Sequence, residues 1–287
     1  MSVLNLSIEE IVAKTTDLPT LPAAALAVMR ETDSASSNAQ SVARNLSHDQ
    51  ALTARVLRLA NSAFYGLSRR VQDPQEAVVI LGMRTVKSLA MIASTYPILT
   101  KPLLGYEIGA DALWRHSFAT GLGAQMIATK TRQSNPDTSF TAGLLHNIGK
   151  LTLSVWLENR LGGMTQIAYR AGVGFDQIEK QLLGFDHADV GAHLAESWNL
   201  PAPLVESIRF HHHPSESAEY QDIADCVHIA DHLAMSLGIG LSGEGHCYSF
   251  DEGAMDRLKI TPELFEEFKV PFKQIFDQQQ SIFEKAA

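Results

Sequence analysis

The sequence has 287 residues, of which 45% are apolar and 19% are charged, so it can form a packed core and intrinsic disorder is excluded. The formal charge of −9 argues against a protein that coats nucleic acid. No run of about 20 apolar residues could span a bilayer, no basic region followed by an apolar run marks a secretory signal, and two cysteines cannot form a disulfide framework. We therefore expect a cytoplasmic protein.

Helical periodicity dominates the chain from its start. Pro22 and Pro74 suit the first turns of helices, and Ser47 or Asp49 is a candidate cap for a third. Helices are expected over residues 23–32, 39–46, 51–64, 74–81, 83–97, 110–129, 139–157, 163–171, 175–183, 187–198, 201–211, 221–237 and 261–284. Strand-like alternation is nearly absent. The fold class is therefore all-α, a multi-helix bundle in two packed lobes.

The clearest break in this pattern lies at residues 97–108, which contain two prolines and a glycine. We place the lobe boundary there and expect lobes of residues 1–105 and 106–287. Residues 51–101 carry seven basic and two acidic side chains, a net charge of +5. A solvated face explains this charge most simply, and contact with an anionic partner is the alternative. The candidate contact residues are Arg55, Arg58, Arg69, Arg70, Arg84 and Lys87, and the seventh basic residue is Lys101.

The segment FTAGLLHNIGKLTL holds the most informative residues. A single helix would align Gly143, His146, Asn147 and Lys150 on a polar stripe, opposite an apolar stripe that ends at Val155. Each glycine in this helix costs about 1 kcal/mol relative to alanine, which close approach of another backbone or a ligand would offset. A lone His-Asn pair on a helix is most often a hydrogen-bonded core pair.

Other histidines and an aspartate on separate expected helices indicate that this pair belongs to a larger candidate site. They are His116, His187, His211, His212 and Asp231. Nitrogen and oxygen donors that converge from several helices are how bundle cores hold first-row divalent metals. We expect His193, His228, His232 and His246 to be surface or core histidines instead, and Cys226 to be packed rather than reactive.

The order of these residues resembles the HD superfamily of metal-dependent phosphohydrolases. The segments LPTLPAAALAVM, DQALTARVLRLANSAFYG and AVVILGMRTVKSLAM narrow the resemblance to the HDOD family (HD-related output domain), over about residues 18–213. The resemblance implies an HD-like second lobe and a bacterial signalling role, such as regulating motility, virulence or second messengers. It also implies metal ligands at His116, His146, His187, His211, His212 and Asp231.

One departure from the family pattern matters most. The superfamily's bridging aspartate is replaced by Asn147, a neutral side chain that bridges two cations poorly and cannot act as a base. We therefore expect the binuclear hydrolytic centre to be lost. A single divalent ion on the remaining ligands and a metal-free hydrogen-bonded cluster both stay open. The Gly-Tyr-Pro signature of cyclic-di-GMP phosphodiesterases is also missing after His213.

The functional hypothesis is a non-catalytic signalling module that acts through contact with a protein partner. The alternative is a phosphohydrolase acting on a nucleotide or other phosphoester, with Lys150 contacting a phosphate. Nucleic-acid binding by the region from Arg55 to Arg84 is a third, less favoured hypothesis.

Overall fold

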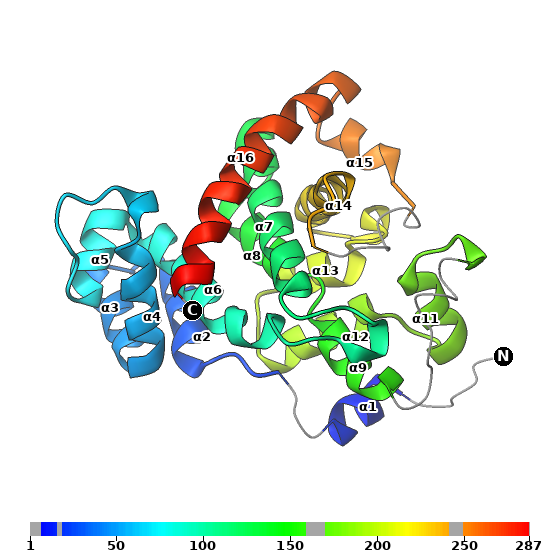
Figure 1. The fold of residues 1–287 in the computed structure, drawn as a ribbon, viewed down its shortest axis with the longest axis horizontal. Coiled ribbons are helices and arrows are strands. Elements are labelled where there is room, and N and C mark those ends of the chain that lie inside the picture. Colours follow the sequence, from blue (N-terminus) through cyan, green and yellow to red (C-terminus); the bar gives the residue numbers. More distant parts are fainter. Residues whose placement is uncertain (1–6, 16–18, 159–169, 241–248, 287) are drawn as a thin grey trace. The chain divides into compact units, whose positions relative to one another are not determined.

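The computed structural model describes residues 7–15, 19–158, 170–240 and 249–286 (Figure 1). These ranges contain helices and no strand, with one isolated antiparallel bridge between Leu103 and Ile108. The all-α prediction is confirmed. Within the same ranges, no helix combines the length and the apolar character needed to cross a membrane.

The chain divides into two compact units. The larger unit comprises Met1–Pro19 and Leu99–Lys273, and the smaller unit comprises Thr20–Ile98 and Gln274–Ala287. This division differs from lobes of residues 1–105 and 106–287 mainly at the two ends of the chain. The N-terminal end belongs with the larger unit because α1 (Ile8–Lys14) packs against its helices α9 and α12 and buries Ile11.

The smaller unit is built from short helices with strong N-terminal signals. They are α2 (Ala23–Thr32), α3 (Ala39–Ser47), α4 (Gln50–Ala60), η1 (Ala63–Tyr65), α5 (Pro74–Leu81) and most of α6 (Met83–Leu99). The side chains of Asn38, Asp49 and Asp73 cap α3, α4 and α5 by accepting hydrogen bonds from backbone N–H groups. The helix expected to stop at Pro97 continues two residues further, to Leu99.

The larger unit contains the longer helices and the candidate site. Its elements are α1, η2 (Leu104–Tyr106), α7 (Ala112–Thr131), α8 (Pro136–Leu145), α9 (Gly149–Glu158), α11 (Phe175–Leu183), α12 (His187–Ser197), α13 (Ala202–Phe210), η3 (Pro214–Glu216), α14 (Gln221–Ser236), α15 (Glu252–Arg257) and the first half of α16 (Pro262–Ala286). The helix predicted over residues 163–171 lies almost wholly outside the described residues.

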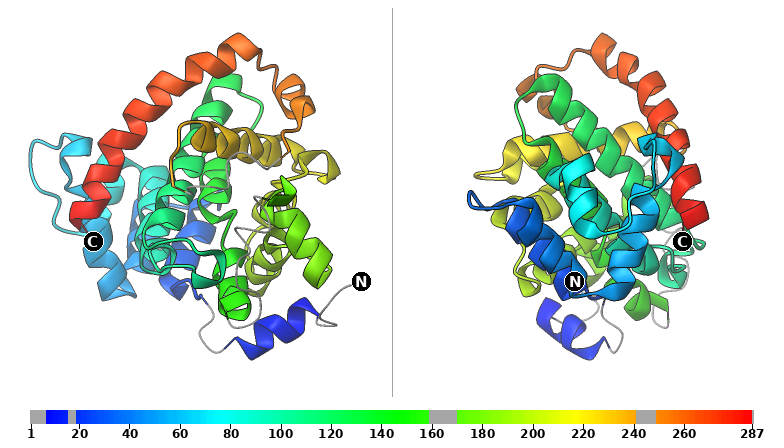
Figure 2. Two further views of the ribbon diagram at one scale, coloured as in Figure 1. Left: turned by 45° about the vertical axis from the view of Figure 1, so that its right-hand side comes forward. Right: turned by 90° about the vertical axis from the view of Figure 1, so that its left-hand side faces the viewer.

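Helices α7, α8 and α14 form the centre of the larger unit, and the turned views keep them adjacent (Figure 2). Their close packing depends on Gly143 of α8, where a Cβ atom would lie 2.8 Å from the Cα of Gly121 in α7. The predicted close approach at Gly143 is confirmed. It brings the C-terminal end of α8, and therefore the histidine that follows it, against the middle of the bundle.

The prediction of one helix over residues 139–157 is wrong. The chain turns at residues 146–148, between the end of α8 at Leu145 and the start of α9 at Gly149. A Cβ atom on Gly149 would lie 1.9 Å from the backbone oxygen of His187, so only glycine lets α9 meet α12 this closely. The turn also changes the helical phase, which leaves Val155 48% exposed instead of buried.

Candidate metal centre

The predicted ligand residues meet inside the larger unit. The structure groups them in two sets, His116, His146 and Asp231 in the first set and His187, His211 and His212 in the second. Within each set the candidate ligand atoms lie within 4.8 Å of one another. The sets adjoin, because the rings of His146 and His211 have centroids 4.9 Å apart. All six side chains and Asn147 are buried, and the most exposed of them, His212, is only 6% exposed.

Helix ends supply three of these six positions. His146 is the C-cap of α8, His187 is the first residue of α12, and His211 is the C-cap of α13. His116 and Asp231 instead come from within α7 and α14, two helices that pack along each other. Donors from five helices therefore converge, as the sequence predicts for a bundle core.

The first set has the electrostatics of a cation site. Asp231 Oδ1 lies 2.7 Å from His116 Nε2 and 3.7 Å from His146 Nε2. The Nδ1 atoms of both histidines face backbone oxygens, Ile239 O at 3.2 Å and Gly143 O at 2.6 Å. Each ring can thus donate from Nδ1 and present its Nε2 lone pair to Asp231. A lone pair and a carboxylate oxygen this close repel each other unless a proton or a cation lies with them.

Asn147 lies beside this first set, in the turn after α8. Its Nδ2 donates a hydrogen bond to His146 Nε2 at 2.6 Å, so an ion that binds this nitrogen must displace the amide N–H group. Its Oδ1 is buried and has no hydrogen-bond partner among the residues that the structure describes. An amide oxygen can ligate a hard cation, so the unpartnered atom fits a single ion better than a bridged pair.

The second set consists of imidazoles alone. His187 Nδ1 donates to Glu179 Oε2 at 2.7 Å, which leaves its Nε2 facing His212 Nε2 at 2.9 Å. His211 Nδ1 donates to Ile208 O at 2.8 Å. The Nε2 atom of His211 is buried and lacks a hydrogen-bond partner within the described ranges. These Nε2 atoms also suit a metal, although no carboxylate belongs to the set.

The protonation states of the second set and of Asp231 suit metal binding. Burial lowers the pKa of His187, His211 and His212 well below the usual value, so these rings are neutral at pH 7. Burial alone would raise the pKa of Asp231, but His116 and His146 beside it hold that pKa well below its usual range. Neutral imidazoles and an ionised carboxylate are the forms that ligate a divalent ion.

Comparison with protein families gives a match over most of the chain. The HDOD domain family model matches residues 18–214. The chain belongs to the HDOD domain family. The resemblance predicted over about residues 18–213 is confirmed.

Three relatives illustrate the family likeness. An HDOD domain protein of unknown function from Geobacter sulfurreducens is 25% identical, with a TM-score of 0.73 over 97% of this chain and 94% of that chain. A "Putative phosphohydrolase" from Shewanella amazonensis SB2B is 28% identical, with a TM-score of 0.69 over 96% of this chain and 98% of that chain. An uncharacterized protein from Treponema pallidum (strain Nichols) is 30% identical over 217 residues. The match covers 75% of this chain and 42% of the Treponema protein, so the chain spans less than half of that relative.

Glu179 is a site residue of this HDOD chain that the sequence analysis missed. Its Oε2 accepts hydrogen bonds from both the backbone N and the Nδ1 of His187 at 2.7 Å, and its Oε1 accepts one from the Tyr106 hydroxyl at 2.6 Å. Burial raises the pKa of Glu179 to about 7, although Tyr106 and nearby Lys150 lower it. A signal was present, because Glu179 falls on the apolar stripe of α11 with Phe175 and Leu183, where an acid needs a partner.

Lys150 is also buried, on α9. Its Nζ lies 5.9 Å from the ring centroid of Tyr106 and 5.6 Å from that of Phe175. After burial, which has the largest effect, its charge is the next cause of the lowered pKa of His187. Lys150 thus lies on the side of the second set, next to Glu179, rather than on an open polar stripe.

The predicted basic surface of the smaller unit needs one correction. Lys87 is buried on the apolar side of α6, and its Nζ pairs with Asp33 Oδ1 at 2.6 Å. It therefore cannot contact a partner as a surface residue. Exposed side chains remain at Arg55, Arg58, Arg69, Arg70 and Arg84.

The remaining predictions concern ordinary core residues. Cys226 is buried, and burial raises its pKa to about 12, as expected for a packed thiol. His228 is a core histidine whose Nδ1 donates to His211 O and whose Nε2 accepts from the backbone N of Asp251. His246 lies outside the described residues.

Proposed function

We propose that this HDOD chain is a cytoplasmic, non-catalytic signalling module whose buried centre holds one divalent ion in the first set. The observation that carries the proposal is Asn147, whose amide nitrogen donates to His146 Nε2 at 2.6 Å. A carboxylate at this position would attract a second cation and bridge it to the first. The amide supplies neither the charge nor the bridge.

Burial supports the same conclusion. A phosphoester must reach the ions that hydrolyse it, yet none of the seven side chains of the centre is more than 6% exposed. A closed centre with one ion suits a structural or sensory role, because the ion would tie α7, α8 and α14 together through His116, His146 and Asp231. Ion binding would then stabilise one arrangement of these helices.

A module without an activity of its own must act through a partner. We propose that the partner is a protein with an acidic face that contacts exposed arginines of the smaller unit. Arg55 on α4 and Arg84 on α6 are both exposed, and they lie outside the loop that follows α4. Like most contacts between exposed charges, this one should weaken as salt increases.

Two measurements test the proposal. The purified protein, supplied in turn with Mn²⁺, Fe²⁺ and Zn²⁺, is expected to show no turnover of bis(p-nitrophenyl) phosphate above a His146→Ala control. A salt-sensitive complex recovered by cross-linking in cells should disappear when Arg55 and Arg84 are changed to Glu. Metal-dependent turnover that His146→Ala removes would overturn the non-catalytic assignment.

The alternative is a metal-dependent phosphohydrolase, and two observations favour it over other activities. Six ligand residues converge although Asn147 has replaced the bridging carboxylate, and the Shewanella relative carries a phosphohydrolase name. In this case Lys150 would hold a phosphate near the second set. Turnover lost in both His146→Ala and Lys150→Met, with metal content kept in Lys150→Met, would establish this activity.

A further inference from the structure

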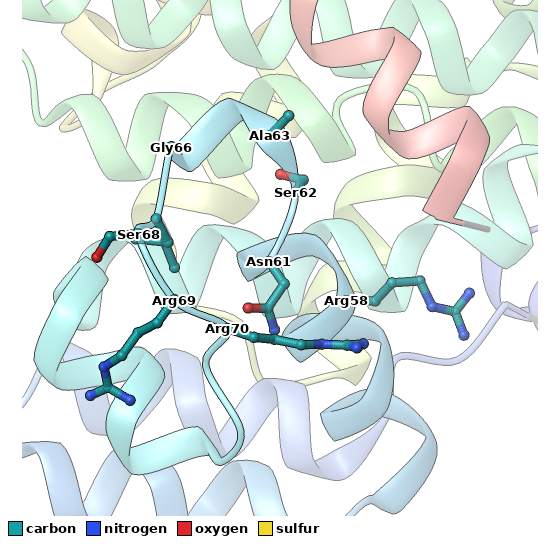
Figure 3. A pocket seen from close by; sticks show the side chains of 9 residues that line it. Arg58, Asn61, Ser62, Ala63, Gly66, Ser68, Arg69 and Arg70 are labelled. Atoms are coloured by element: carbon teal, nitrogen blue, oxygen red, sulfur yellow. The ribbon is translucent and has the colours of Figure 1, made fainter.

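The smaller unit contains a pocket of about 510 Å³ between the end of α4 and the loop that follows (Figure 3). This volume falls within the range of small-molecule sites, roughly 300–1,000 Å³. The pocket lies far from the metal ligands in sequence and belongs to the other unit. Its lining residues are Arg58, Asn61, Ser62, Ala63, Gly66, Leu67, Ser68, Arg69 and Arg70.

Asn61 fixes the rim of this pocket. Its Oδ1 accepts a hydrogen bond from Val71 N at 2.7 Å, and its Nδ2 donates to Leu57 O and Val71 O, each at 2.8 Å. The side chain therefore clamps the two ends of the loop, and Gly66 turns the chain at its far end with a φ of +56°. A loop closed in this way holds its side chains in place before any ligand arrives.

The charge of the pocket is positive. Three of the nine lining residues are arginines and none is acidic. Arg69 forms an ion pair with Glu76, which is not a lining residue. In Figure 3 the side chains of Arg58 and Arg70 extend toward the same side of the loop, whereas Arg69 extends the other way.

A buried hydroxyl adds a second indication of a ligand. Ser62 Oγ is shielded from solvent and has no hydrogen-bond partner among the residues described for this chain. A buried hydroxyl without a partner is unfavourable, so a ligand oxygen that accepts from it would be stabilised. Leu67 and Ala63 provide the apolar surface that a base or another flat group could cover.

We infer that this pocket binds a phosphorylated small molecule of nucleotide size. Guanidinium groups bind phosphate oxygens through paired, charge-assisted hydrogen bonds. A phosphate group therefore fits Arg58 and Arg70 better than a single carboxylate does. The inference goes beyond the proposed function, because it adds an input site in the smaller unit and does not depend on the metal centre.

The test is calorimetric titration of the full chain with ATP and GTP in EDTA, so that no metal links the nucleotide to the histidine sets. Arg58→Gln and Arg70→Gln are expected to weaken the affinity for at least one nucleotide by about tenfold or more each. Arg44→Gln is the matched control, because Arg44 is exposed on α3 of the same unit and does not line the pocket. The nucleosides adenosine and guanosine should not bind.

Several outcomes would overturn the inference. One is the absence of measurable binding for both nucleotides. Another is an equal loss of affinity in Arg44→Gln, which would show attraction to charge in general. A phosphoserine peptide that binds as tightly as the nucleotides would overturn the nucleotide class. Ser62→Ala gives a second measurement that leaves all charges in place. If neither Ser62→Ala nor Arg58→Gln changed the affinity, the nucleotide would not bind in this pocket. Thermal unfolding of each variant confirms that it is folded.

Discussion

The two histidine sets of this HDOD chain have similar burial but different charge. The first set combines His116 and His146 with the ionised Asp231, whereas the second set contains three imidazoles that burial keeps neutral. The carboxylate nearest to the second set, Glu179, accepts hydrogen bonds from His187 and has a pKa raised to about 7 by burial. It therefore positions a ligand instead of serving as one.

This difference teaches what the residue at position 147 controls. A divalent cation loses its hydration on entering a buried site, and ligand charge is the main compensation. The first set supplies one negative charge and the second supplies none. An aspartate at position 147, next to His146, would add a second negative charge, and we infer that the second set needs this charge to hold an ion.

The largest effect is expected from Asp231→Asn. This change keeps the size of the side chain but removes the only negative charge of the first set. Metal content, measured by elemental analysis after dialysis, should fall from about one ion per chain to near zero. Asp222→Asn on the same helix is the control and should keep its ion, because Asp222 belongs to neither set. Wild-type protein that contains no ion would contradict the proposal that the first set binds a metal.

Asn147→Asp should have the opposite effect. The new carboxylate would lie next to His146 and supply the missing charge, so metal content should rise from about one ion toward two. His187→Ala in the same background should remove the second ion only. If Asn147→Asp left the metal content unchanged, the second set would not be a metal site even with a carboxylate beside it.

The sequence identifies the residues that converge in the larger unit, mainly through the family resemblance. The proline and cap residues mark the helix starts, and the histidines that follow α8 and α13 stand at helix ends. The family resemblance then places these separate positions in one pocket. Periodicity alone fails at residues 146–148, because the break there depends on contact between Gly149 and the distant His187 backbone.

Long-range pairing also explains the other misses. Nothing near Lys87 in the sequence shows that Asp33, 54 residues earlier, would pair with it and remove it from the surface. Glu179 and Tyr106 are 73 residues apart, and their hydrogen bond exists only once α11 has packed. An ionisable residue on an apolar stripe is the one local sign of such partners, and both Lys87 and Glu179 show it.

Glu179→Gln tests whether Glu179 supports metal binding at the second set alone. The amide can still accept from Tyr106 or His187, but it loses the charge that orients the His187 ring through Nδ1. Residues that orient a ligand typically change metal affinity by about 10–100-fold. We expect a loss of that size for the second ion of Asn147→Asp and no change for the first ion. Glu216→Gln, exposed in η3, is the control. Equal weakening of both ions would mean that Glu179 supports the whole centre.

His228 gives the smallest expected effect, and it links the second set to pH. Burial, with nearby His232, lowers the pKa of His228 from 6.5 to about 4, and its Nδ1 donates to the backbone oxygen of His211. Below pH 6.5 the unfolded chain takes up a proton at this residue that the native protein does not. The contribution of His228 to stability is therefore present above pH 6.5 and is lost as the pH falls toward 4.

Between pH 7 and pH 5, metal-free wild-type protein should lose roughly 2 kcal/mol more of its free energy of unfolding than His228→Gln. Urea unfolding at the two pH values measures this, and His48→Gln, exposed in the smaller unit, should follow the wild type. A loss of stability in His228→Gln that matches the wild type would show that His228 is not held neutral, and the coupling of this helix to His211 would then have to rest on packing alone.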